Sequence, residues 1–241
     1  LVQDVGHANF TTVRDSDRVS IAHFDVGWPI SMNKRTVKGP PPQIRPAPLV
    51  ILSHWDWDHL HGFYVWPALQ RKIWIAPIQD LGPGALKIAK TLNDAGLLFS
   101  VPPWDGKRHA ILYQGQMRIG QRNPTHAKTK AAIKNNSGLF LTVQVGLKRL
   151  ALLPGDADYY AISWPHKDKP TLLVVPHHGA RIEGNILPAS SRGDTAVVSM
   201  GLGNVYRHPN SKVLKEYRKK GWRLHFTARW NGAPRGDRSL E

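Results

Sequence analysis

The chain has 241 residues, of which 41% are hydrophobic, so it is long enough to bury a core as one folded domain spanning residues 1–241. It has 33 Lys and Arg against 17 Asp and Glu, and the formal net charge of +16 predicts an anionic partner such as nucleic acid, beyond what solubility requires. The sequence contains no cysteine, which excludes disulfides and thiolate ligands, so nitrogen and oxygen must hold any metal.

No apolar run approaches the roughly 18 to 20 residues that cross a bilayer, and the first residues do not resemble an export signal. We therefore expect no transmembrane segment and favour a cytoplasmic location. The chain begins at Leu1 instead of methionine, which leaves an upstream signal, anchor or further domain open.

Hydrophobic patterning and turn residues predict the following elements in chain order. The predicted strands are residues 10–13, 19–25, 48–53, 72–76, 139–145, 149–153, 172–175, 196–200 and 223–227. The predicted helices are residues 60–70, 86–95 and 211–220. Because strands come in hairpins early and alternate with helices later, we predict an α/β fold of two packed sheets with helices outside, a four-layer αββα sandwich.

The segment SHWDWDHLHG, residues 53–62, follows a predicted buried strand and places four His and Asp side chains within six positions. In an extended backbone alternate side chains share a face, so we expect His54, Asp56 and Asp58 to converge while the tryptophans face a hydrophobic wall. His59 follows where the chain turns into the next helix. Carboxylates and imidazoles at this density need a cation, which favours a divalent metal over a solvated acidic loop.

Two further loops follow apolar strands and carry the same residue types. PGD at 154–156 follows the strand predicted at 149–153, and PHHG at 176–179 follows the strand predicted at 172–175. Loops at one rim of a sheet sandwich can share a site. Taken alone, the aspartate could be a cap or turn residue and the histidine pair could be structural, but beside the first motif a shared metal site is favoured.

The motifs taken together resemble those of the metallo-β-lactamase fold superfamily, in the branch around the hydrolase domain of the competence protein ComEC. The likeness covers nearly the whole chain, in the order of that branch. It is carried by DVGH at 4–7, FDVG at 24–27, HWDWDH at 54–59, NNS at 135–137, LPGD at 153–156, PHHG at 176–179 and NVYRHP at 204–209.

The resemblance implies an αββα domain with two divalent ions, either zinc or manganese. By that pattern His54 and Asp56 would hold the first ion, Asp58 and His59 would hold the second, and Asp156 would bridge both. One of the two histidines at 177 and 178 would complete the second ion's ligands, and His177 is favoured over His178.

The resemblance also implies residues around the ligands. Asp25 and Asn136 would support the ligands from behind, and Asp25 and His208 could also lie over the substrate. The superfamily's usual further histidine on the first ion has no clear match: His126 is a candidate but lies in a Lys-rich loop, and NNS stands at 135–137, where the ComEC-like branch carries asparagines and serine. The first ion is therefore expected to be held more weakly.

Hydrolysis by a metal-activated hydroxide follows from such a site. Two ions roughly 3.5 to 4 Å apart can share a hydroxide and stabilise both the attacking and the leaving oxygen. The expected catalytic residues are Asp58, Asp156 and His208. Asp156 would position the hydroxide and accept its proton, and His208 would donate to the leaving group or hold a phosphate oxygen, unless it is only a loop residue ahead of Pro209.

The last part of the chain points to the substrate. From Arg207 to Arg238 ten basic residues stand against two acidic ones and are interleaved with Tyr and Trp, a mixture that binds phosphates and stacks bases. A solvated helix face is the alternative interpretation. The predicted substrate-binding residues are Lys212, Lys215 and Lys219, which helical spacing places on one face, together with Tyr206 and Arg207.

We therefore predict a metal-dependent phosphodiesterase, most simply a nuclease acting on DNA. A small-molecule phosphodiesterase acting on a phosphocholine-type or cyclic-nucleotide substrate would use the same ligands. Outside the enzymes, a basic DNA-binding module with a non-catalytic metal site is the alternative.

Overall fold

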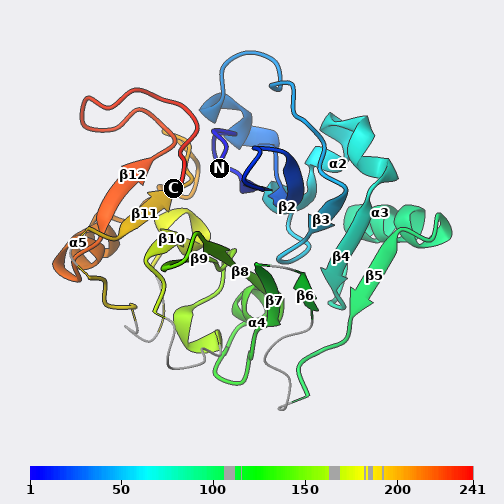
Figure 1. Cartoon of the computed structure of the whole chain (residues 1–241). Helices are drawn as coiled ribbons and strands as arrows, with labels where there is room; N and C mark the ends of the chain where they lie inside the picture. Colours follow the sequence, from blue (N-terminus) through cyan, green and yellow to red (C-terminus); the bar gives the residue numbers. More distant parts are fainter. Residues whose placement is uncertain are drawn as a thin grey trace.

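The computed structural model describes residues 1–105, 112–114, 116–162, 169–181, 183, 187–191 and 193–240. Within these residues the strands form two sheets that face each other, and helices lie outside them (Figure 1). The predicted four-layer α/β sandwich is confirmed.

The first sheet has the strand order β1-β2-β3-β4-β5 among the described residues. β1 and β2 form the predicted antiparallel hairpin, and β2 to β5 run parallel to one another. The parallel strands therefore end at the same edge, and the polar motif at 53–62 follows directly beyond β3. The strands are β1 (Phe10–Arg14), β2 (Ser20–Val26), β3 (Leu49–Ile51), β4 (Ile73–Pro77) and β5 (Leu98–Val101).

The second sheet has the order β12-β11-β10-β9-β8-β7-β6 within the same described ranges. β6 to β9 alternate in direction, whereas β9 to β12 run parallel. β9 and β10 are neighbours, so the loops that follow them leave the sheet together. The strands are β6 (Leu112–Gln114), β7 (Met117–Gln121), β8 (Leu139–Val145), β9 (Arg149–Leu153), β10 (Leu172–Val174), β11 (Thr195–Val198) and β12 (Arg223–Phe226).

The single helix predicted over residues 60–70 is wrong, because three short helical turns occupy this region. They are α1 (Trp57–Leu60), α2 (Gly62–Val65) and the 3-10 turn η2 (Pro67–Arg71). Pro67 disfavours a helical conformation at the residue before it, and Trp66 accordingly has a φ of −121° and a ψ of 88°. The other helical elements are η1 (Ser31–Thr36), α3 (Pro83–Asp94), α4 (Lys130–Asn136), η3 (Tyr159–Ala161), η4 (Pro176–Gly179) and α5 (Ser211–Lys219).

Buried apolar side chains of the described residues fall into three clusters, one between each pair of neighbouring layers. Because successive side chains of a strand face opposite ways, one strand contributes to two clusters. In β3, Val50 joins the cluster under α2 and α3, and Ile51 joins the cluster between the sheets. In β8, Leu141 lies between the sheets and Phe140 lies under α5.

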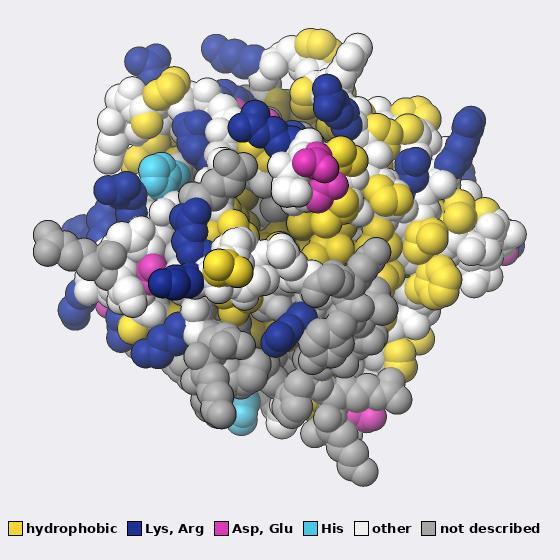
Figure 2. Space-filling model, viewed as in Figure 1, with side chains coloured by type: hydrophobic (Ala, Val, Ile, Leu, Met, Phe, Trp, Pro, Cys, Tyr) yellow, Lys and Arg dark blue, Asp and Glu magenta, His cyan; other side chains and the backbone are white. Residues whose placement is uncertain are grey.

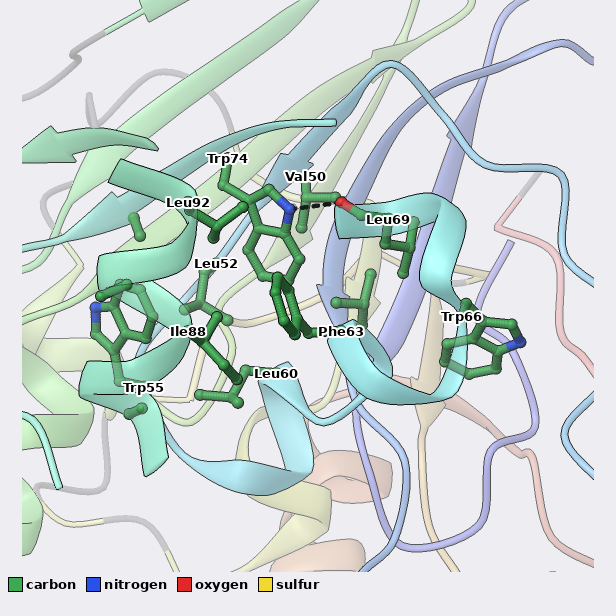
Figure 3. Close-up of a cluster of buried hydrophobic side chains, with 14 of the residues drawn as sticks. Val50, Leu52, Trp55, Leu60, Phe63, Trp66, Leu69, Trp74, Ile88 and Leu92 are labelled. Atoms are coloured by element: carbon green, nitrogen blue, oxygen red, sulfur yellow. Dashed lines mark hydrogen bonds between the residues drawn. The ribbon is translucent and has the colours of Figure 1, made fainter. Parts of the chain in front are cut away.

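The cluster behind the polar motif is rich in tryptophan, and Figure 3 shows its side chains converging from β3, β4 and the helices outside them. Trp55 is 4% exposed, and its Nε1–H donates to the carbonyl oxygen of Pro77 at 2.7 Å. Trp74 is fully buried and donates to the carbonyl oxygen of Leu69 at 2.9 Å. The predicted hydrophobic wall therefore exists and fixes the start of the motif.

Among the described residues, no helix combines the length and the apolar composition that a membrane span requires. The longest helix, α3, has 12 residues and buries only one face, with Ala85, Ile88, Ala89 and Leu92.

Candidate metal centre

Three loops meet at one rim of the sandwich and bring the predicted ligands together. Two overlapping groups of His and Asp side chains could each hold a metal ion, and within each group the ligand atoms lie within 4.8 Å of one another. One group is His54, His59 and Asp156, and the other is Asp58, His59 and His178. We call His54 with Asp56 the His54 half-site, and Asp58 with His59 and His178 the His178 half-site; Asp156 lies between them.

The backbone that presents the motif differs from the extended chain we predicted. α1 begins at Trp57 with Asp56 as its N-terminal flanking residue, so Asp58 and His59 come from a helical turn. His54 and Asp56 precede that turn. Trp57 packs against the same cluster as Trp55, but it is only partly buried. The side chains still converge, because the helical turn carries Asp58 and His59 toward the same rim.

In the His54 half-site, the imidazole of His54 is fully buried beside two carboxylates. Its Nε2 lies 3.2 Å from Asp56 Oδ2 and 3.9 Å from Asp156 Oδ2. Asp56 is far more open, with 42% of its side chain exposed, and its other oxygen forms an ion pair with Lys134. Burial would raise the pKa of Asp56, but His54 and Lys134 outweigh it and lower the pKa below its ordinary value.

In the His178 half-site, the imidazole nitrogens face carboxylates from two directions. His178 Nε2 lies 3.3 Å from Asp58 Oδ2, and His59 Nε2 lies 3.2 Å from Asp156 Oδ1. Asn9 adds an amide nitrogen 3.1 Å from that same Asp156 oxygen. His59 and His178 are at most 1% exposed, whereas 28% of the Asp58 side chain is open to solvent.

Each of the three buried histidines is held through its Nδ1, which leaves its Nε2 for a ligand. His178 Nδ1 lies 2.8 Å from the carbonyl oxygen of Ser199, which can only accept. His59 Nδ1 lies 2.7 Å from Asp25 Oδ2. The hydroxyl of Ser53 donates to Asp25 and lies 3.0 Å from His54 Nδ1. Because each Nδ1 donates a hydrogen bond in this arrangement, Nε2 is the nitrogen left to bind an ion once the ring is neutral, as in metal-binding histidines.

Buried acids give the site a strong preference for positive charge. Burial would lower the pKa of His59, but the carboxylates of Asp156, Asp25 and Asp58 outweigh it and raise the pKa well above its ordinary value. Burial would raise the pKa of Asp156, but His59, His177 and His54 lower it far below the ordinary range. Asp156 is therefore ionised at neutral pH, and the surrounding groups favour a cation between these carboxylates.

Arg122 supports the loop that carries Asp156 from below. It is fully buried, and its guanidinium donates to the carbonyl oxygens of Asn135 and Pro154. Gly155 has a φ of +58°, and a Cβ there would lie 2.4 Å from the Arg122 guanidinium and 2.6 Å from Ser53 Cβ. The glycine therefore serves both the backbone conformation and the close packing under the site.

Other predicted ligand and support residues are placed as follows. Asp25 accepts hydrogen bonds from Ser53 and His59, as a supporting residue would. The hydrogen bonds of Asn136 go to Asp158 and not to a ligand atom. Its side-chain nitrogen donates to the Asp158 carboxylate at 2.9 Å, and its side-chain oxygen accepts from the backbone N–H of Asp158 at 2.8 Å. His126 is exposed and contacts the ring of Tyr160, outside both groups.

The structure joins His178, and not the favoured His177, to Asp58 and His59. His177 is 40% exposed, and its Nε2 lies 3.7 Å from Asp156 Oδ2. Both histidines have a positive φ, 49° for His177 and 53° for His178. This turn sends the second ring inward and leaves the first at the rim, which spacing along the sequence does not reveal.

An aromatic and imidazole layer lies over the His178 half-site. The ring of His208 is stacked on Tyr206 with a centroid separation of 5.8 Å, and it lies 5.4 Å from the ring of His177. Burial, with His177 and His178 nearby, lowers the pKa of His208 to about 4. At neutral pH this ring is uncharged, so it can offer one N–H to an oxygen. Arg207 is exposed beside it.

The predicted basic face lies on α5. Leu214 and Tyr217 are buried against the second sheet, and Lys212, Lys215 and Lys219 are exposed. The helix begins next to the PHHG loop, because the amide of its capping residue Asn210 donates to the carbonyl oxygen of Gly179 at 2.8 Å. Lys and Arg side chains gather most densely on the side of the molecule that carries α5 and β12 (Figure 2).

Sequence reasoning missed four residues around the site: His7, Asn9, Arg122 and Lys134. His7 is 1% exposed, its ring lies 4.2 Å from that of His178, and neither of its nitrogens has a hydrogen-bond partner among the described residues. Its position in DVGH, where it departs from the usual motif, was the available signal. Arg122 and Lys134 lie in polar stretches that read as loops, so the sequence offered no signal for them.

Comparisons with protein-family models and with curated proteins gave no match. Solved structures do match. Zinc-bound PqqB from Methylobacterium extorquens is 11% identical, with a TM-score of 0.45 over 91% of this chain and 85% of that one. The metallo-β-lactamase fold protein YhfI from Bacillus subtilis is 14% identical, with a TM-score of 0.49 over 98% and 96% of the two chains. An isothiocyanate hydrolase from Delia radicum gut bacteria is 11% identical, with a TM-score of 0.50 over 93% and 95%.

The two sheets and their outer helices form a four-layer α/β sandwich, and this fold is similar to that of the isothiocyanate hydrolase. At one rim of this fold the chain carries His and Asp groups that could hold a metal ion.

Proposed function

We propose that the protein is a metal-dependent hydrolase that cleaves phosphodiester bonds, with DNA as its substrate. The observation that carries the proposal is the pair of overlapping His and Asp groups at the ends of β3, β9 and β10. The resemblance of its motifs to the ComEC-like branch supports the same reaction class. So does the hydrolase among the structural neighbours, although that protein is named for a different substrate.

The residues present fit divalent ions. His54 Nε2 is buried and makes no hydrogen bond among the described residues, and Asp156 is only 6% exposed between imidazoles. Imidazole nitrogen and carboxylate oxygen suit zinc and manganese. We propose that His54, Asp56 and Asp156 hold one ion and that Asp58, His59, His178 and Asp156 hold the other.

A bound divalent ion lowers the pKa of water from about 16 toward 7 and offsets negative charge on phosphoryl oxygens. The chain's own groups supply the rest. Asp156 is ionised and could accept a hydrogen bond from the attacking water between the half-sites, which would orient it toward the substrate. His208, neutral at pH 7, can donate one N–H to a phosphate oxygen, and Tyr206 extends the flat surface on which a base could stack.

The proposal of DNA as substrate depends on charge. The net charge of +16 favours a polyanion over a small neutral substrate. α5 presents exposed lysines and starts at the PHHG loop, so a strand whose phosphate enters the rim could continue along that helix. Lysines spaced along a groove or face contact phosphates without selecting a base sequence.

The test is cleavage by protein loaded with Zn²⁺ or Mn²⁺. Single-stranded DNA, duplex DNA and a chromogenic small phosphodiester are incubated with wild type and with Asp58→Ala and His59→Ala. Metal-dependent DNA cleavage that both substitutions abolish is the expected result. Turnover of the small phosphodiester alone would replace DNA with a small substrate, and DNA binding without cleavage would indicate a binding module.

A further inference from the structure

The carboxylate of Asp56 already has a cationic partner. Lys134 in α4 forms an ion pair with Asp56 Oδ1, and its ammonium lies 3.4 Å from the carbonyl oxygen of Trp55. The other oxygen of Asp56 faces His54 Nε2 at 3.2 Å. The ammonium thus lies at the edge of the His54 half-site, next to a residue that would otherwise be a metal ligand.

Hydrogen bonds from Gln79 hold Lys134 in this position. The side-chain amide of Gln79 donates to the carbonyl oxygen of Lys134 at 2.7 Å and to Ser137 Oγ at 2.8 Å. Its oxygen accepts the amide of Trp55 at 3.4 Å. Gln79 therefore fastens the last turn of α4 to the residue before Asp56, and only 28% of the Lys134 side chain is exposed.

A second constraint comes from His59, which belongs to both possible metal groups. Its Nδ1 is engaged by Asp25 at 2.7 Å, so only Nε2 can bind an ion. One nitrogen lone pair serves one ion. If His59 binds with Asp58 and His178, the His54 half-site keeps His54, a share of Asp156 and a carboxylate, Asp56, that Lys134 has already neutralised.

We propose that Lys134 takes the place of an ion at the His54 half-site, so that the resting protein holds one divalent ion tightly, at the His178 half-site. This inference rests on the metal site of the proposed function and gives it a stoichiometry. The ammonium neutralises Asp56 and provides a second positive charge beside the bound ion. A second ion must share the carboxylate of Asp56 with that ammonium, which lies beside it with the same sign of charge, and its affinity is correspondingly lower.

The experiment counts bound metal and does not depend on activity. Metal-free protein is dialysed against buffered Zn²⁺, and in parallel against Mn²⁺, and the bound ion is measured across a range of free concentrations. Wild type is expected to bind one ion tightly and a second at least about 10-fold more weakly, the scale of an ion pair that is partly exposed. Lys134→Met, which keeps the apolar stem, is expected to tighten the second ion by roughly that factor.

Two further variants isolate the cause. Lys130→Met removes an exposed lysine from the same helix and should leave both affinities unchanged. Lys134→Met is also introduced into Asp56→Asn protein, where it should no longer change the second affinity relative to Asp56→Asn alone, because the lysine acts through that carboxylate. A gain that survives in the double variant would overturn the proposed route.

Two equally tight ions in wild type, or an unchanged second affinity in Lys134→Met, would overturn the inference and leave the proposed function standing. Failure of every protein, wild type included, to bind either metal would overturn both. DNA cleavage by wild type holding a single ion is the further result expected from this stoichiometry.

Discussion

The two half-sites arise from one short motif, yet their surroundings differ. The His178 half-site has two imidazoles that are almost completely buried, fixed through Asp25 and Ser199, with a third ring, His7, packed against it. The His54 half-site has one buried imidazole, His54, and a partly exposed carboxylate, Asp56, that forms an ion pair with Lys134. A motif of four ligand-type residues therefore does not by itself specify two equal ion sites; the groups behind each ligand decide the affinity.

The most severe way to break this comparison is to remove the support that both half-sites share. Arg122→Met leaves the carbonyl oxygen of Pro154, which is buried, and that of Asn135, which is partly buried, without their donors, and each such loss costs about 1–3 kcal/mol. We expect a loss of about 3 kcal/mol in the free energy of unfolding, measured by urea denaturation. Arg149→Met, at an exposed position of β9, is the control and should change little. Equal losses in the two variants would contradict the role given to Arg122.

Removing one imidazole from each half-site tests the asymmetry directly. His178→Ala should weaken the tight ion by at least about 100-fold, because even outer partners of a metal ligand contribute 10–100-fold. His54→Ala should leave that ion in place and affect only the weak one. Zn²⁺ titration of both variants measures the difference. Loss of the tight ion in His54→Ala, with its retention in His178→Ala, would reverse the assignment.

Two glycines with nearly the same backbone angle sharpen the comparison by separating strain from packing. Gly155 has a φ of +58° and no room for a Cβ, whereas Gly146 has a φ of +60° and nothing within 4 Å. Alanine at either position costs about 1–2 kcal/mol for the left-handed conformation. Gly155→Ala should lose a further 1–3 kcal/mol or so from overpacking and also weaken metal binding through Asp156. Thermal or urea unfolding that gives equal losses would refute the packing argument.

The smallest effects are expected outside both half-sites. Lys215→Ala on α5 should weaken DNA binding evenly across sequences and lower the slope of log affinity against log salt by about 1, the value for one lost phosphate contact. Its metal affinities should remain those of wild type. Lys87→Ala on α3, also exposed, is the matched control and should leave the slope as it was. Fluorescence anisotropy over a salt series gives both slopes.

Much of the fold was predictable because the hydrophobic pattern of a strand can be read from its own few residues, without knowledge of the strands that pair with it. The hairpin 139–145 and 149–153 was predicted at its observed bounds. β5, β6, β7 and α4 were missed. α4 has only seven residues, KAAIKNN, and lacks the repeated apolar stripe that marks a helix. It is held in place by Gln79, which lies far away in the sequence.

The sequence by itself determined that His and Asp side chains follow three apolar strands, and hence that a metal site was expected at one sheet edge. Only the tertiary structure decided how those side chains divide. Trp57 begins a helical turn, and the positive φ of two consecutive residues turns the ring of His178 inward instead of that of His177. Lys134, 78 positions away in the sequence, forms an ion pair with Asp56. Periodicity along a chain reports which face a residue takes, whereas ion affinity depends on contacts between segments that only folding brings together.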